Sequence, residues 1–79
     1  MQMLSILAAH FTTKDRLEAI RARHERKSYR AGYDRAHYEL TLWGYLPRPY
    51  VPSQYGHKAF MAGWRAAVHQ LRSEGKLTD

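Results

Sequence analysis

Apolar positions recur with helical spacing in two stretches of this chain. Both stretches read aromatic, any residue, Ala, Gly, aromatic, any two residues, Ala, and the second repeats the first 31 positions later. The shared positions, extended by one leucine, are spaced i, i+4, i+7, i+11, which marks one face of an α-helix. They are Tyr29, Tyr33, Ala36 and Leu40 in the first copy, and Phe60, Trp64, Ala67 and Leu71 in the second.

Each stretch also carries a glycine inside the predicted helix. Gly32 and Gly63 each follow an alanine, although glycine in a helix interior costs about 1 kcal/mol relative to alanine. Close approach of two helix backbones, with the neighbouring aromatic rings filling the space around the contact, would explain the choice. We therefore predict that the two stretches are the arms of a helical hairpin.

The first arm is predicted to be long. From Lys14 to Trp43 the chain has no Pro and one Gly, so we predict a helix over 14–43, either continuous or broken near Lys27-Ser28. Leu17 and Ile20 lie on a different side from the tyrosine-bearing face. A straight helix with these two apolar faces would need a separate packing partner for each face. The second partner would be the apolar N-terminal segment or a second copy of the chain.

The remaining segments complete a single domain over 1–79. Residues 44–53 contain three prolines and form a predicted Pro/Tyr loop. A second helix is predicted over 54–74, with Ser53 as its N-cap and Gly75 ending it before a tail over 75–79. The apolar segment 1–11 is predicted to pack on the hairpin. The fold class is therefore all-α, a helical hairpin of two helices, with a dimer as an open alternative.

The charge balance predicts an anionic partner. The chain has 79 residues, 13 Lys plus Arg against 7 Asp plus Glu, and a net charge of +6. Nine of the cations are Arg, whose planar fork of donors suits phosphate groups. The apolar start is about half the ~20 residues needed to span a bilayer, and it lacks a basic leader region. We expect a cytoplasmic protein with no membrane partner.

Cations gather in the middle of the first predicted helix, where six fall within fifteen residues: Arg21, Arg23, Arg26, Lys27, Arg30 and Arg35. Arg16, Arg23, Lys27 and Arg30 share one helical face, and such a ridge could follow a phosphate backbone. The plain alternative is a charged face in water. Tyrosines in the Pro/Tyr loop could stack on unpaired bases or could close one end of the hairpin. Both pairs of alternatives stay open on the sequence alone.

Signals for catalysis and metal binding are weak. The five histidines include no pair at i, i+3 or i, i+4, and there is no cysteine to join them. There is no Gly-rich phosphate loop and no nucleophile motif. Most of the acids stand three to five residues from a cation, as on a solvated helix face. We predict no catalytic residues, no metal site, no cofactor and no enzymatic activity.

Three motifs in this order resemble the ribosome modulation factor family. They are Tyr29-Arg30-Ala31-Gly32-Tyr33, then Arg48-Pro49-Tyr50, then Phe60-Met61-Ala62-Gly63-Trp64-Arg65-Ala66-Ala67. The family shows a basic helix with a Gly-Tyr-x-Ala-Gly segment, a Cys-Pro-Tyr loop, and an aromatic residue before Gly-Gly-Trp-Arg-Glu-Ala. The resemblance covers roughly residues 21 to 72, and Gly63-Trp64-Arg65 is its most specific part.

The resemblance implies a small helical translation regulator that binds ribosomal RNA on the small ribosomal subunit. It would act by occluding an RNA site. The implied RNA-binding residues are Arg23, Arg26, Lys27, Arg30, Arg35, Arg48, Tyr50 and Arg65. The alternative is a small protein–protein inhibitor or adaptor, for example one encoded by a phage or another mobile element. It would use the apolar N-terminus and the Tyr-rich loop to bind a protein partner.

Overall fold

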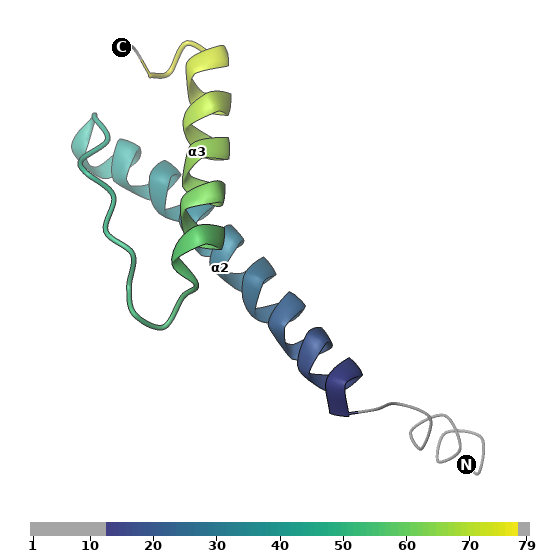
Figure 1. Ribbon diagram of the computed structural model, residues 1–79. Helices are drawn as coiled ribbons and strands as arrows, with labels where there is room; N and C mark the ends of the chain where they lie inside the picture. Colours follow the sequence, from purple (N-terminus) through teal and green to yellow (C-terminus); the bar gives the residue numbers. More distant parts are fainter. Residues whose placement is uncertain (1–12, 78–79) are drawn as a thin grey trace, which may run out of the picture.

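The computed structural model describes residues 13–77, which form two helices joined by one loop (Figure 1). Helix α2 spans Thr13–Trp43, and helix α3 spans His57–Ser73. No strand occurs between residues 13 and 77, so the prediction of an all-α helical hairpin is confirmed. Helix α2 is continuous and has no break at Lys27-Ser28. The predicted packing of segment 1–11 falls outside the described residues.

The two helices cross at Gly32 and Gly63. A Cβ atom placed on Gly32 would lie 2.8 Å from the carbonyl carbon of Phe60, and one on Gly63 would lie 2.8 Å from the carbonyl carbon of Tyr29. Each would lie closer still to the attached carbonyl oxygen. The helix backbones are therefore in direct contact at this point, and a side chain on either glycine would separate them.

The core is asymmetric between the two helices. All four apolar positions of α3 are buried, with Phe60 only 1% exposed, whereas on α2 only Ala36 is fully buried. Tyr33 and Leu40 are half-buried, and Tyr29 is 43% exposed. The face of α2 that meets α3 consists instead of Ser28, Gly32, Ala36 and Glu39. Small residues on α2 thus make room for the large side chains of α3.

Glu39 departs from the expectation that the acids lie on solvated helix faces. Its side chain is 11% exposed. One carboxylate oxygen, Oε1, accepts a hydrogen bond of 2.6 Å from Arg35 Nε. The other, Oε2, is buried and has no hydrogen-bond partner among the described residues. Burial here follows from the crossing geometry, because Glu39 shares the face of α2 that α3 covers.

The loop over 44–56 is packed against the helices. Leu46, Val51 and Tyr55 lie against the core, and the ring of Tyr55 is 5.8 Å from that of Phe60. The end of the loop is fixed by a long-range hydrogen bond, in which the N–H of Gly56 donates to the buried hydroxyl of Ser28 at 2.8 Å. This bond ties the start of α3 to the middle of α2.

The second helix begins three residues later than the sequence predicted, and Ser53 is not its N-cap. The N-cap is Gly56, with no side-chain capping bond. Residues 52–55 form a turn in which Tyr55 N–H donates to the Pro52 carbonyl at 3.1 Å. The turn uses the residues that would otherwise begin the helix, so α3 starts at His57.

Glycines end both helices. Gly75 has a φ of +73°, and its N–H donates to the Arg72 carbonyl while the N–H of Lys76 donates to that of Leu71. This pair of bonds is a Schellman motif, as the position of the glycine predicted. Gly44, with a φ of +77°, donates to the Leu40 carbonyl at the end of α2.

The N-terminal half of α2 extends beyond the crossing. A helix of 31 residues is about 46 Å long, and α3 crosses it in its C-terminal half (Figure 1). From residue 13 to residue 27 every side chain is exposed except that of Ala22. We call residues 13–27 the overhang. Within the described residues, neither helix has the length and apolar character to cross a membrane.

Candidate nucleic-acid interface

A row of cations lies on the side of α2 that faces away from α3. Because each residue of an α-helix advances the side chain by about 100°, Arg16, Arg23, Lys27 and Arg30 lie about half a turn from Gly32. All four are exposed. We call these four residues the α2 ridge. Arg26 lies beside the ridge and is also exposed. The spacing that grouped these residues in the sequence therefore places them on one open surface.

Most of these cations have no competing carboxylate. Among the described residues, Arg23, Arg26 and Lys27 have no ion-pair partner. Arg30 Nε lies 3.2 Å from Asp34 Oδ2, but the two side chains are 79% and 61% exposed. An exposed pair of this kind contributes about 0.3–0.5 kcal/mol, so a phosphate group could displace Asp34 at little cost.

Arg35 differs from the cations above because its guanidinium group contacts a largely buried side chain of α2. Its guanidinium group pairs with the largely buried Glu39, and its Cζ lies 6.0 Å from the ring centroid of Tyr38. Moving Arg35 to a ligand would leave a buried carboxylate without its partner, which is costly. Arg35 is thus committed to the fold, and we do not include it in the α2 ridge.

The loop and α3 place the other predicted residues elsewhere. Arg48 borders a recess of about 500 Å³ that also includes Trp64, Val68 and Arg72. Arg65 lies two positions, or about 200°, from Gly63, so it faces away from α2. Tyr50 is 76% exposed, whereas Tyr55 packs into the core. The structure does not bring the eight sequence-predicted residues together on one surface.

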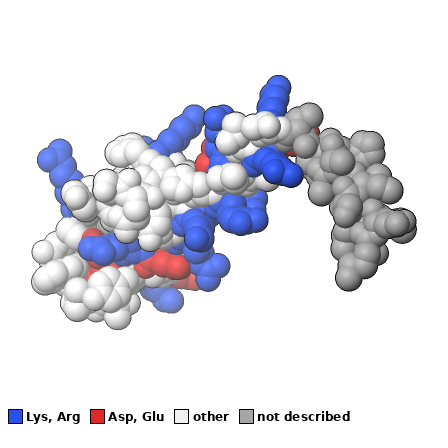
Figure 2. Space-filling view, turned by 90° about the horizontal axis from the view of Figure 1, so that it is seen from below, with Lys and Arg blue, Asp and Glu red and all other residues white. Residues whose placement is uncertain are grey.

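A second row of cations on α3 was largely missed by the sequence analysis. Lys58, Arg65 and Arg72 are seven residues apart, so they follow one side of the helix, and all three are exposed. The i, i+7, i+14 spacing was the available signal. Figure 2 shows one face of the molecule on which blue Lys and Arg side chains gather around fewer red carboxylates. The end away from the grey residues is mostly white.

The described residues contain no group of three or more His, Asp or Glu side chains placed to hold a metal ion. The ring of His37 packs at 4.8 Å from that of Tyr33. His24 lies near Gly56, where the loop meets α2. The first of these contacts lies within α2, and the second lies between α2 and the loop.

Comparison with known proteins adds no assignment to this geometry. No protein-family model matches the chain, and neither a curated protein nor a solved structure matches it significantly.

Proposed function

We propose that this chain is a non-enzymatic RNA-binding protein whose contact surface is the α2 ridge together with Arg26. The observation that carries the proposal is a row of exposed cations on the open side of α2. Among the described residues, Arg23, Arg26 and Lys27 have no ion-pair partner. A chain with a net charge of +6 gains affinity for a polyanion by releasing the counterions of each phosphate it neutralises.

The resemblance to the ribosome modulation factor family supports ribosomal RNA of the small subunit as the target. In this proposal the ridge lies along the phosphate backbone and covers an RNA site that another molecule would use. Ridge contacts to phosphates fix position but read no sequence. Exposed Tyr50, with Arg48 two residues before it, would supply stacking on an unpaired base.

Co-sedimentation with bacterial ribosomes on a sucrose gradient tests the proposal. The informative variant is Arg23→Gln/Lys27→Gln, because neither side chain has an ion pair whose loss would disturb the fold. The matched control, Lys14→Gln/Lys76→Gln, removes the same charge from positions off the ridge. We expect the wild type and the control to travel with the ribosomal particles and the ridge variant to stay at the top. Equal behaviour of the two variants would reject the ridge as the contact surface.

A protein–protein inhibitor or adaptor is the second candidate function. Large apolar side chains are exposed at both ends of α2 and in the loop, including Leu17, Ile20, Leu42, Trp43 and Tyr50, which are 55–76% exposed. A contact through such side chains would respond weakly to salt, whereas phosphate contacts weaken steeply. If the wild type does not travel with ribosomes at low salt, this second function becomes the better supported one.

A further inference from the structure

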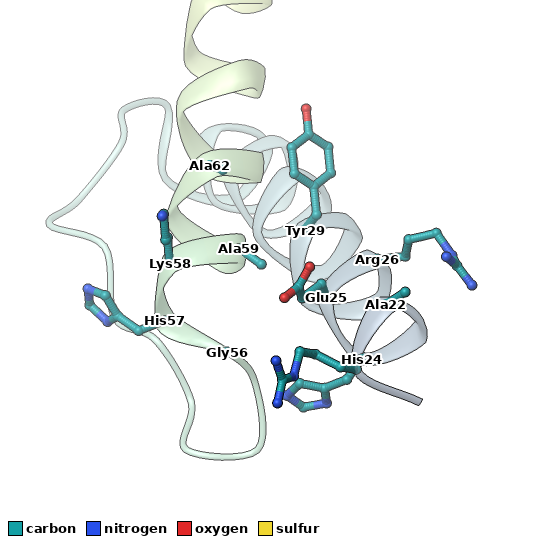
Figure 3. A pocket seen from close by; sticks show the side chains of 11 residues that line it. Ala22, His24, Glu25, Arg26, Tyr29, Gly56, His57, Lys58, Ala59 and Ala62 are labelled. Carbon is teal, nitrogen blue, oxygen red and sulfur yellow. The ribbon is translucent and has the colours of Figure 1, made fainter. Parts of the chain in front are cut away.

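The angle between the overhang of α2 and the first turns of α3 encloses a hollow. Its volume is about 740 Å³. Figure 3 shows Glu25 and Tyr29 on α2, and Ala59 and Ala62 on α3, along its two walls. Ala22 completes the apolar part of the lining. We call this hollow the interhelix groove.

Small side chains determine what can lie in the interhelix groove. Three alanines and the half-exposed ring of Tyr29 leave the helix backbones accessible over much of its apolar lining. Alanine-lined grooves between two helices admit a third helix, whose aliphatic side chains fill the space that the small residues leave. Among the lining residues, Tyr29 is the single Phe, Tyr or Trp side chain on which a base could stack.

The charges of the lining residues indicate which kind of partner the interhelix groove can bind. Arg21, Arg26 and Lys58 line it, and Glu25 is the single acidic side chain among the lining residues. His24 and His57 also border it. Segment 1–11 has no acidic residue, and a second copy of the chain carries a net charge of +6. Neither is complementary to this rim, whereas an acidic segment of another protein is.

We infer that the interhelix groove binds an acidic amphipathic helix of a partner protein. The aliphatic face of that helix would pack on Ala22, Ala59 and Ala62, and its carboxylates would pair with Arg21 and Lys58. The α2 ridge lies about half a turn away around α2, and Arg26 alone belongs to both the groove lining and the proposed RNA contact surface, so this site does not depend on the RNA-binding proposal. A chain with both surfaces can hold an RNA and an acidic protein segment together.

NMR titration of the ¹⁵N-labelled full chain separates this site from the ridge. The probe is an 18-residue peptide with leucines at i, i+3, i+4 and i+7 spacing and glutamates on the other positions. We expect it to shift the amide signals of Ala22, Ala59 and Ala62. The same peptide with lysine in place of glutamate should bind at least about ten-fold more weakly. A U-rich 12-mer RNA should instead shift the signals of Arg23, Lys27 and Arg30.

Two variants and a control sharpen the test. Ala62→Trp places an indole in the groove from an exposed position and should abolish peptide binding, whereas Ala19→Trp on the open side of α2 should leave it unchanged. Glu25→Gln removes the one opposing carboxylate and should tighten binding by about five-fold. Circular dichroism of each variant shows whether the helices are retained.

Three results would overturn the inference. The first is no shift of the groove amides at about 1 mM acidic peptide, where even weak specific binding is visible. The second is a shift of the groove amides by the RNA that equals the shift by the peptide. The third is a set of NOE contacts, in the free chain, between methyl groups of residues 1–11 and those of Ala59 and Ala62. That result would show that the chain fills its own groove.

Discussion

Gly32 and Gly63 decide how closely the two helices approach. Each lies where a methyl group would meet the backbone of the opposite helix, and backbone atoms cannot move aside as the end of a side chain can. The helix-propensity cost of about 1 kcal/mol at each glycine is therefore offset by packing that only a residue without a Cβ allows. The large rings of Phe60 and Trp64 then reach the surface of α2 on both sides of the contact.

Replacement of either glycine by alanine should destabilise the protein. An alanine in an unobstructed helix interior would raise the free energy of unfolding by about 1 kcal/mol. Here we expect Gly32→Ala and Gly63→Ala to lower it by roughly 2 kcal/mol, because overpacking at the crossing outweighs the gain in propensity. Urea unfolding followed by circular dichroism measures the change. The direction of the change in the free energy of unfolding is decisive, because an increase in stability would mean that the helices do not touch at this point.

Ser28 is a second residue whose role depends on the opposite element. Its hydroxyl is fully buried and accepts the N–H of Gly56 at 2.8 Å. Ser28→Ala leaves that N–H without its partner, and we expect a loss of about 1–3 kcal/mol in the free energy of unfolding. Ser73→Ala is the control, because its hydroxyl donates to the Gln70 carbonyl on an exposed surface. The control should change stability by less than about 0.5 kcal/mol.

At the scale of the element, the long helix has two halves with different support. Residues 28–40 contact α3 and the loop, whereas the overhang has almost no tertiary contact. Isolated helices of about 15 residues are marginal in water. The overhang therefore depends on its continuity with the packed half of α2.

Hydrogen exchange should show this difference directly. We expect the amides of residues 17–23 to exchange faster than those of residues 30–38 by at least about 100-fold, because local opening of the overhang breaks no core contact. Mass spectrometry of peptic fragments, at two protein concentrations, provides the measurement. Slow exchange of residues 17–23 that depends on concentration would show that a second copy covers Leu17 and Ile20, contrary to this prediction.

The sequence predicted the elements because their signals are local. The repeat of aromatic, Ala and Gly positions is contained within single helices, and so are the glycine stop at Gly75 and the absence of proline across α2. The start of α3 was misplaced because its position depends on the turn over 52–55 and on the bond from Ser28, which lies 28 residues before Gly56. The burial of Glu39 was missed for the same reason, since only the crossing decides which side of α2 is covered.

For the candidate site, too, the sequence predicts the arrangement of residues within one helix but not between different elements. Arg16, Arg23, Lys27 and Arg30 lie on one side of α2 because helical spacing alone determines that arrangement. No such rule relates residues of different elements. Arg65 and Arg48 were grouped with the ridge from the resemblance, and the crossing instead places Arg65 on the side of α3 away from α2. Sequence spacing could not give this result, because it does not contain the relative orientation of the two helices.

At the scale of the whole molecule, charge and apolar surface are separated around α2. One side of α2 carries the ridge, the opposite side meets α3, and the interhelix groove opens beyond the crossing (Figures 1 and 3). A compact domain of two helices would bury more of the longer one. The open arrangement leaves surface for two partners at once, and the salt dependence of binding distinguishes a polyanion from an apolar partner.

The number of ridge contacts sets the expected salt dependence. Binding to single-stranded RNA weakens with a slope of about −0.7 in log K against log salt for each phosphate neutralised. Five contacts, from the four ridge residues and Arg26, predict a slope of about −3.5 and an affinity loss of about 130-fold between 50 and 200 mM salt. Fluorescence anisotropy with a labelled U-rich 12-mer measures it.

The ridge variant Arg23→Gln/Lys27→Gln removes two of these five contacts. We therefore expect the magnitude of its slope to fall, to about −2.1, and its loss over the same salt range to be about 18-fold, while Lys14→Gln/Lys76→Gln keeps the wild-type slope. A general attraction between a basic chain and RNA would lower the slope equally in both variants, because both lose two charges. Only a difference between the two variants locates the phosphate contacts on the open side of α2.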